Sequence, residues 1–377
     1  SATADNDAQL NATTSNATES AGSALADASS KAFGGLVAMN KVSSGAEAFI
    51  ERENLDPQLP ALQVGGALTI KAEENAGIYA NTKIVASSVT TNDGGVGVVA
   101  ETVNDLVSAD FNTDEGTRDI EFGDRVRLSD AYDSTLGNPG SVYQFMGATA
   151  NGAGLDLGVQ DYTDLGLWKE VLETQLFPDG VNIDNSDSTT VGGLVVLNDL
   201  RSNVEARLQN VVATAGSIDI DAIENATVTA IADSTAISSG GNSFDGQGES
   251  LAANGVIATN GVLSAAQAFI NNSDVTTTLG DVAVDAKNLS SIDAQTLSAT
   301  QTGANGVGVT LAFNQVGWDS QNWLFNAVDT ILGDPLIANA FGNQTPALVQ
   351  AYIRDSSVDA AGGIDLSAVS EIGRAHV

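Results

Sequence analysis

Carboxylates at alternating positions of short aliphatic segments are the residues of this chain best placed to do chemistry. Asp219 and Asp221 are two residues apart, so their side chains share one face of an extended strand. The candidate set is Asp219, Asp221, Asp281, Asp285 and Asp365. Because Ca²⁺ prefers carboxylate oxygens, we expect weak, distributed calcium binding along an acidic strip, and no other cofactor. The alternative is that these residues form an ordinary solvated strand face.

A second candidate site is aromatic. Residues 105–190 differ from the rest of the chain in being rich in Tyr, Phe, Trp and Arg. Within them, the run Gly123–Lys169 resembles small chitin-binding-type carbohydrate modules. The resemblance implies sugar stacking on Tyr143, Tyr162 and Trp168. The alternative is that these rings form the core of a small domain, and we expect Trp168 to be mostly buried.

Several kinds of catalytic site are excluded. The chain has no Cys, and its one His, His376, lies in residues 371–377, which match a translated sequencing adapter and which we interpret as an artefact. The usual triads and zinc sites therefore lack their residues. Gly95–Ala100 fits G-x-G-x-x-A, but β-branched residues follow, which favours a turn into a strand. We expect no enzyme.

The net charge of the chain limits the classes of partner that it could bind. The chain has 377 residues and a formal charge of −34, from 48 acidic and 14 basic residues. Nucleic acids and anionic membrane surfaces need basic partners, so we expect neither. No run of eighteen apolar residues is present, which argues against membrane insertion.

The elements that position these residues are repeats. Four segments share the pattern Gly, any residue, aliphatic, any residue, aliphatic, any residue, Ala, and they begin at Gly66, Gly216, Gly280 and Gly362. Strict alternation indicates strands with one buried face, and we expect the Gly to allow a corner. The residues expected to be buried are Leu68, Ile70, Ile218, Ile220, Val282, Val284, Ile364 and Leu366.

The repeat extends upstream of each Gly. Ala48, Ala206, Ala268 and Ala351 open similar short segments, and Asn40, Asn198 and Asn260 stand eight residues before the first three. Asn314 precedes Ala351 by the same eight residues plus an insertion of 29. A compound pattern of this length predicts a stacked array.

The array predicts an all-β chain, a parallel β-solenoid that we expect to be right-handed. Residues 1–104 and 191–370 form its repeats, residues 105–190 a β-rich insertion module, and residues 315–346 a short helical insertion. That helix would present Trp323, Ala327, Val328, Ile331 and Leu332 on one face, after a cap at Asp319 or Ser320. With ~20 residues per coil, we expect roughly fourteen coils and a length on the order of 70 Å.

The repeat as a whole resembles the giant β-strand-repeat proteins of bacterial surfaces, which are filamentous-haemagglutinin-like proteins and large adhesin stalks. Ala268–Ala286, Ala351–Ala368 and Gly123–Lys169 carry this resemblance. It implies an extracellular or cell-surface bacterial protein and a structural, adhesive stalk segment within a longer parent. Its partners would be neighbouring repeats of the same chain and surface glycans or matrix. The first alternative is a carbohydrate-binding module displayed on the stalk. A polysaccharide-active β-helix enzyme is the second, and it would need a cleft of convergent Asp, Lys and Arg.

Overall fold

The structure is a computed structural model of the chain. It describes residues 1–23, 28–55, 60–91, 98–102, 109–121, 123–145, 147, 154–164, 167–171, 174–178, 186–240, 249–302, 305–320, 341–344 and 346–371. None of the helical segments in these ranges is long and apolar enough to cross a membrane.

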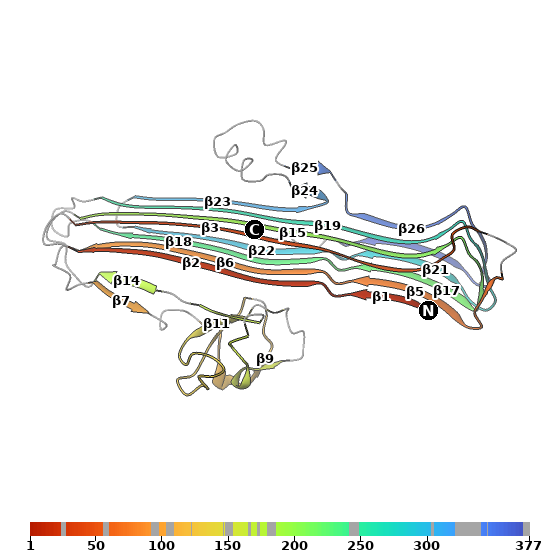
Figure 1. Cartoon of the computed structure of the whole chain (residues 1–377), viewed down its shortest axis with the longest axis horizontal. Coiled ribbons are helices and arrows are strands. Elements are labelled where there is room, and N and C mark those ends of the chain that lie inside the picture. Colours follow the sequence, from red (N-terminus) through yellow and green to blue (C-terminus); the bar gives the residue numbers. More distant parts are fainter. Residues whose placement is uncertain are drawn as a thin grey trace.

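The chain forms an all-β parallel solenoid whose long strands run side by side (Figure 1). Each coil passes through four sheets, named here A to D. Sheet A holds, in order, β1 (Ala2–Asn6), β5 (Ala67–Glu74), β17 (Ser217–Glu224), β21 (Val282–Asn288) and β28 (Ile364–Ser370). Sheet B holds β2 (Gln9–Ser23), β6 (Gly77–Thr91), β18 (Thr227–Ser239) and β22 (Ser291–Thr302).

The other two sheets complete the coil. Sheet C holds β3 (Ala28–Glu51), β15 (Ser186–Gln209), β19 (Ser250–Asn271) and β23 (Asn305–Val316), and β26 (Leu348–Arg354) also pairs with β19. Sheet D is short and holds β4 (Leu62–Gln63), β16 (Val212–Ala215), β20 (Asp274–Thr277) and β27 (Ser357–Asp359). Sheets A and B lie against sheet C, and the aliphatic core fills the space between them.

The coil is about three times longer than the sequence predicted. Asn198 and Asn260 are neighbours on adjacent strands and lie 62 residues apart in the chain. Sheet A contains five strands, so the stack has about four full coils and extends on the order of 20 Å. The expectation of fourteen coils was wrong because it assumed short strands, whereas β3 and β15 each have 24 residues. The molecule is longest along its strands (Figure 1).

The predicted inward faces are confirmed in three of the four repeats. Val284, Ile220 and Ile70 are fully buried, and Val282, Ile218 and Leu68 are at most 2% exposed. Ile364 and Leu366 of β28 contradict the prediction, since they are 46% and 47% exposed. β28 is the last strand of sheet A, so no further strand of that sheet covers its inward side chains.

The register of the upstream pattern is confirmed by an asparagine ladder. Asn40 donates to Asn198, Asn198 to Asn260 and Asn260 to Asn314, each through Nδ2 to Oδ1 at 2.7–2.8 Å. Ala206 pairs with both Ala48 and Ala268. The 29-residue insertion inferred from spacing is therefore correct.

The predicted corners are confirmed, because the chain bends at Gly66, Gly216, Gly280 and Gly362 as it enters sheet A. The glycines that open the sheet A segments do not have positive φ; Asn210 and Asn272 do, at 56° and 45°, where the chain passes from sheet C to sheet D. Gly216 is needed because its backbone packs closely against that of Gly66 in the neighbouring coil. A Cβ at position 216 would lie 3.0 Å from the carbonyl oxygen of Gly66.

The insertion begins and ends with an antiparallel ribbon of β7 (Val98–Thr102) and β14 (Thr174–Pro178). Between these strands lies a module with β8 (Phe111–Asn112), β9 (Thr117–Arg118), β10 (Arg125–Arg127), β11 (Val142–Phe145), β12 (Leu155–Asp156), β13 (Trp168–Glu170) and two 3-10 turns, η2 (Thr113–Glu115) and η3 (Leu157–Val159). The solenoid resumes at Ser186, a few residues before the expected boundary.

The second insertion is described only at its ends. β24 (Trp318–Ser320) pairs antiparallel with β25 (Phe341–Gln344), so Asp319 and Ser320 belong to a strand rather than to a helix cap. The predicted helix, with Trp323 to Leu332 on its apolar face, lies outside the described residues, as do residues 372–377 of the presumed adapter segment.

Candidate functional site

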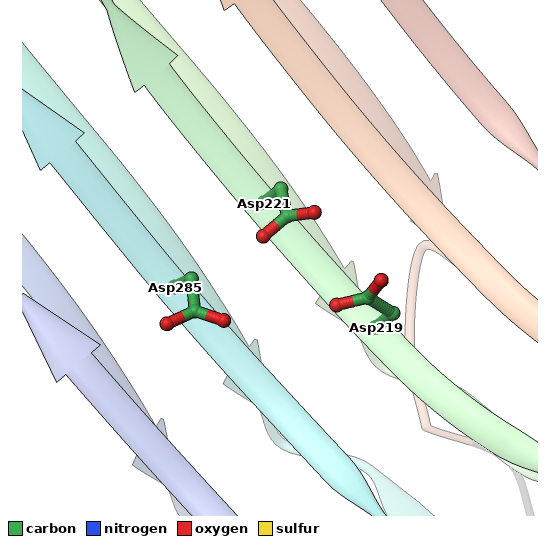
Figure 2. A group of neighbouring side chains, drawn as sticks. All are labelled: Asp219, Asp221 and Asp285. Carbon is green, nitrogen blue, oxygen red and sulfur yellow. The ribbon is translucent and has the colours of Figure 1, made fainter.

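Three of the five predicted aspartates meet on the outer face of sheet A. One carboxylate oxygen from each of Asp219, Asp221 and Asp285 lies within 4.8 Å of the other two. Asp221 pairs directly with Asp285 in the adjacent coil, and Asp219 lies two residues before Asp221 on the same strand. Figure 2 shows the three carboxylates on the same side of β17 and β21. This juxtaposition follows from in-register stacking of one repeat on the next.

The electrostatics of this group favour a bound positive charge. Partial burial is the main cause that raises the pKa of Asp221, and the charges of Asp219 and Asp285 raise it further. Lys287 and Lys71 act in the opposite direction, since they lower the pKa. Lys71 pairs with Asp221 in register, but its ammonium forms an ion pair with Glu73 at 2.7 Å. The positive charge of Lys71 is therefore divided between Glu73 and the aspartate group.

The other two predicted ligands lie apart from this group. Asp281 precedes β21, and its side chain accepts a hydrogen bond from the backbone N–H of Gly363. Asp365 is exposed on β28 and pairs with Ala283 rather than with an aspartate. The acidic strip is therefore a compact group of three, because the outward positions of neighbouring coils do not all carry acids.

This donor set suits a hard cation. Ca²⁺ takes six to eight oxygen ligands, and three carboxylates could supply up to six, with water completing the shell. The three side chains are half-buried, so a bound ion would remain open to solvent on one side. Such an arrangement predicts weak binding, since it is not an enclosed cage.

The predicted aromatic platform is the core of the insertion module. Trp168 and Tyr162 are each 1% exposed and Tyr143 is 5% exposed. Tyr162 lies at the centre, with its ring centroid 4.5 Å from that of Trp168 and 5.2 Å from that of Tyr143. Burial raises the pKa of Tyr162, whose hydroxyl donates to the carbonyl of Leu157. The prediction that Trp168 is buried is confirmed, and these rings offer no face to a sugar.

A cleft between the module and the outer face of sheet B is lined by both acidic and basic side chains. It has a volume of about 170 Å³ and is lined by Lys83, Asp233, Arg125 and Glu170, among others. Lys83 and Asp233 are in register on β6 and β18, with Nζ and Oδ2 3.6 Å apart and side chains only 14% and 19% exposed. At its base, the side chain of Asn81 donates to that of Gln144, which in turn donates to the carbonyl of Gly123 at 2.7 Å.

The sequence did not reveal this cleft. Lys83 and Asp233 belong to different coils, and Arg125 and Glu170 to a module whose docking position has no local signal. Once the repeats are aligned, however, Lys83 and Asp233 occupy equivalent positions, because each follows its signature glycine, Gly66 or Gly216, by seventeen residues. Repeat alignment could therefore have placed these two side chains together.

The comparisons with known proteins return no match. No protein-family model, curated protein or solved structure matched the chain.

Proposed function

We propose that the chain is a structural and adhesive segment, a stalk or matrix element of a secreted or surface-attached bacterial protein. The observation that carries this proposal is the continuous in-register stacking of long strands. β15 pairs over its length with β3 on one side and with β19 on the other. Most of the chain therefore serves to build continuous parallel sheets.

Hydrogen-bonded ladders support a structural role. Beside the asparagine ladder, buried serines join sheets B and C: Ser188 bonds to Ser88 at 3.0 Å and Ser238 bonds to Ser188 at 2.9 Å. Buried polar side chains that bond to equivalents in the next coil stabilise one register over its alternatives. Neighbouring repeats are therefore the first partners of each coil, and glycans or matrix are the proposed external ones.

Antibodies raised against the purified chain test the location and role. On intact, unpermeabilised source bacteria, we expect labelling at the cell surface or in the surrounding matrix, viewed by immunoelectron microscopy. Cells disrupted before labelling control for antibody access. Labelling seen only after disruption would contradict the proposal.

A second candidate function is glycan binding, and the cleft over sheet B is the observation that favours it. Arg125 and Gln144 line this hollow of about 170 Å³ together with apolar residues such as Ile231, and a sugar offers both hydroxyls and an apolar ring face to such a lining. On a glycan array, Arg125→Ala should lose any signal given by the whole chain, whereas Arg118→Ala, at an exposed ion pair on the same module, should retain it.

The same cleft allows a direct test of the enzyme alternative, because it gathers Asp, Lys and Arg on a solenoid face. Our proposal includes no catalytic step. Incubation with a panel of polysaccharides should therefore release no new reducing ends, and release that Asp233→Asn abolishes would establish an enzyme instead.

We also propose that calcium binds weakly at Asp219, Asp221 and Asp285 and stiffens sheet A. The closeness of the three carboxylates and the raised pKa of Asp221 support this.

A further inference from the structure

The outer face of sheet C carries an apolar surface that the functions proposed above do not use. It comprises outward side chains on all four long strands, here called the sheet C apolar face. Its residues are Phe33, Val37 and Met39 on β3; Val191 and Val195 on β15; Ala253 and Ile257 on β19; and Val307, Val309, Leu311 and Phe313 on β23. Leu197 of β15 also points outward but is only 3% exposed, so it is not part of this face. Phe33, Val37 and Val307 are 63%, 65% and 56% exposed.

These strands are apolar on both sides. Leu194 and Val196, which alternate with Val195 and Leu197, point inward and are buried against Ile84 of sheet B. Parallel strands with continuous apolar runs are normally covered on both faces, whereas a strand with one solvated face alternates apolar and polar residues. This part of sheet C therefore has the composition of a sheet with a covering layer.

The face has a ridge-and-groove relief. Gly35, Gly193 and Gly255 form a row across three strands, and nothing lies within 4 Å of the position a Cβ would take at any of them. On β23 the next position in the row is Val309, so the groove spans β3, β15 and β19 and ends at β23. The row of Val37, Val195, Ile257 and Leu311 stands directly beside it, two residues further along each strand. A groove and a ridge of matching direction thus lie next to each other.

This relief is self-complementary. A second copy related by a two-fold axis would place its valine–isoleucine ridge in the glycine groove of the first copy, and would receive the ridge of the first in its own groove. The face also has no ionisable side chain between Lys31 and Lys41 or in the paired positions of the other strands. In a chain of charge −34, it is a surface where two copies can meet without juxtaposing carboxylates.

We propose that the sheet C apolar face is an interface between two copies of this chain. The face measures roughly 20 Å along the strands and 20 Å across them, which gives about 800 Å² of total buried surface. That area is below the usual range for stable complexes, so the dimer is transient and forms at micromolar or higher concentrations. The proposal does not depend on the stalk assignment.

Sedimentation equilibrium of the whole chain tests the proposal. The wild type should pass from monomer to dimer as its concentration rises, and the dimer fraction should increase with sodium chloride, because salt screens the repulsion between acidic copies. Val195→Glu should weaken association at least tenfold, whereas Asn203→Glu, an outward position on the same strand beyond the face, should not. Circular dichroism should show that both variants retain their β signal.

Disulfide trapping gives a second readout that does not require a disruptive substitution. The chain has no cysteine, so a single introduced thiol can pair only with its copy in another molecule. Gly193→Cys should form disulfide-linked dimers under mild oxidation, and Ala299→Cys, exposed on sheet B, should not. A wild type that stays monomeric at all concentrations, or equal cross-linking at both positions, would overturn the proposal.

Discussion

Replacing the buried carboxyl of Glu224 by an amide should stabilise the protein at neutral and alkaline pH. Glu224 is fully buried between sheets A and C, where its Oε1 accepts a hydrogen bond from Ser202 at 2.7 Å. Its Oε2 has no partner among the described residues. Directly beside it in register is Glu74, also fully buried, which accepts bonds from Asn6 and Ser44.

Burial is the main cause that raises the pKa of Glu224 from 4.5 to about 8, and the charge of Glu74 adds to it, while the Ser202 bond acts against it. The folded chain therefore holds a proton that the unfolded chain releases between these pH values. Stability should fall as pH rises from about 4.5 to about 8 and should be constant above that range. At about 1.4 kcal/mol per pKa unit, a shift from 4.5 to about 8 makes the loss at most about 5 kcal/mol.

Urea unfolding followed by far-ultraviolet circular dichroism, at several pH values between 5 and 9, measures this effect. Glu224→Gln mimics the protonated acid and cannot ionise, so the variant should match the wild type at pH 5 and exceed its unfolding free energy by about 2–4 kcal/mol at pH 8.5. Glu249→Gln, at an exposed carboxylate, provides the matched control. A wild-type-minus-variant difference that does not change with pH would refute the reasoning.

The remaining predictions concern the stack, the module and the charge. Val284→Asp should destabilise the fold by about 4 kcal/mol or more in urea unfolding, because it puts an unpaired charge into a fully buried ladder; an effect below about 1 kcal/mol would contradict this. Asn198→Ala should cost about 2–4 kcal/mol, since it leaves the amides of Asn40 and Asn260 without one partner each, and Asn203→Ala is its exposed control. Excision of residues 105–185, which ends just before β15 begins at Ser186, should leave the β circular-dichroism signal of the solenoid intact, and loss of that signal would show that the module is not a peripheral unit. Calcium should raise Tm beyond sodium chloride of equal ionic strength, and Asp221→Asn should remove that excess; equal effects of the two salts would show screening alone.

The sequence was informative wherever one repeat could be compared with another. The signature glycines, the alanines and the asparagines were spaced so regularly that they placed Asn314 opposite Asn260 across an insertion, and the structure pairs them. Alternation likewise placed Val284 and Ile220 in the core.

Two features were not predictable in the same way. The coil length was missed because the signature segment is only one of four strands in a coil, and the extent of β15 shows no turn signal that marks it. The sites were missed in part because they depend on which outward residues face each other. Asp221 and Asp285 meet only through register, and the same register places Asp365 opposite Ala283, away from the other carboxylates.

In-register stacking of 62-residue coils is the central claim, and a pair of pyrene labels on introduced cysteines tests it most directly. Asn203 and Ala265 are paired outward positions on β15 and β19, so pyrenes at Asn203→Cys and Ala265→Cys should stack and give excimer fluorescence. The pair Asn203→Cys and Asn271→Cys, six residues further along β19, should give monomer emission only. Excimer emission from the second pair and not the first would contradict the register, and with it the solenoid described here.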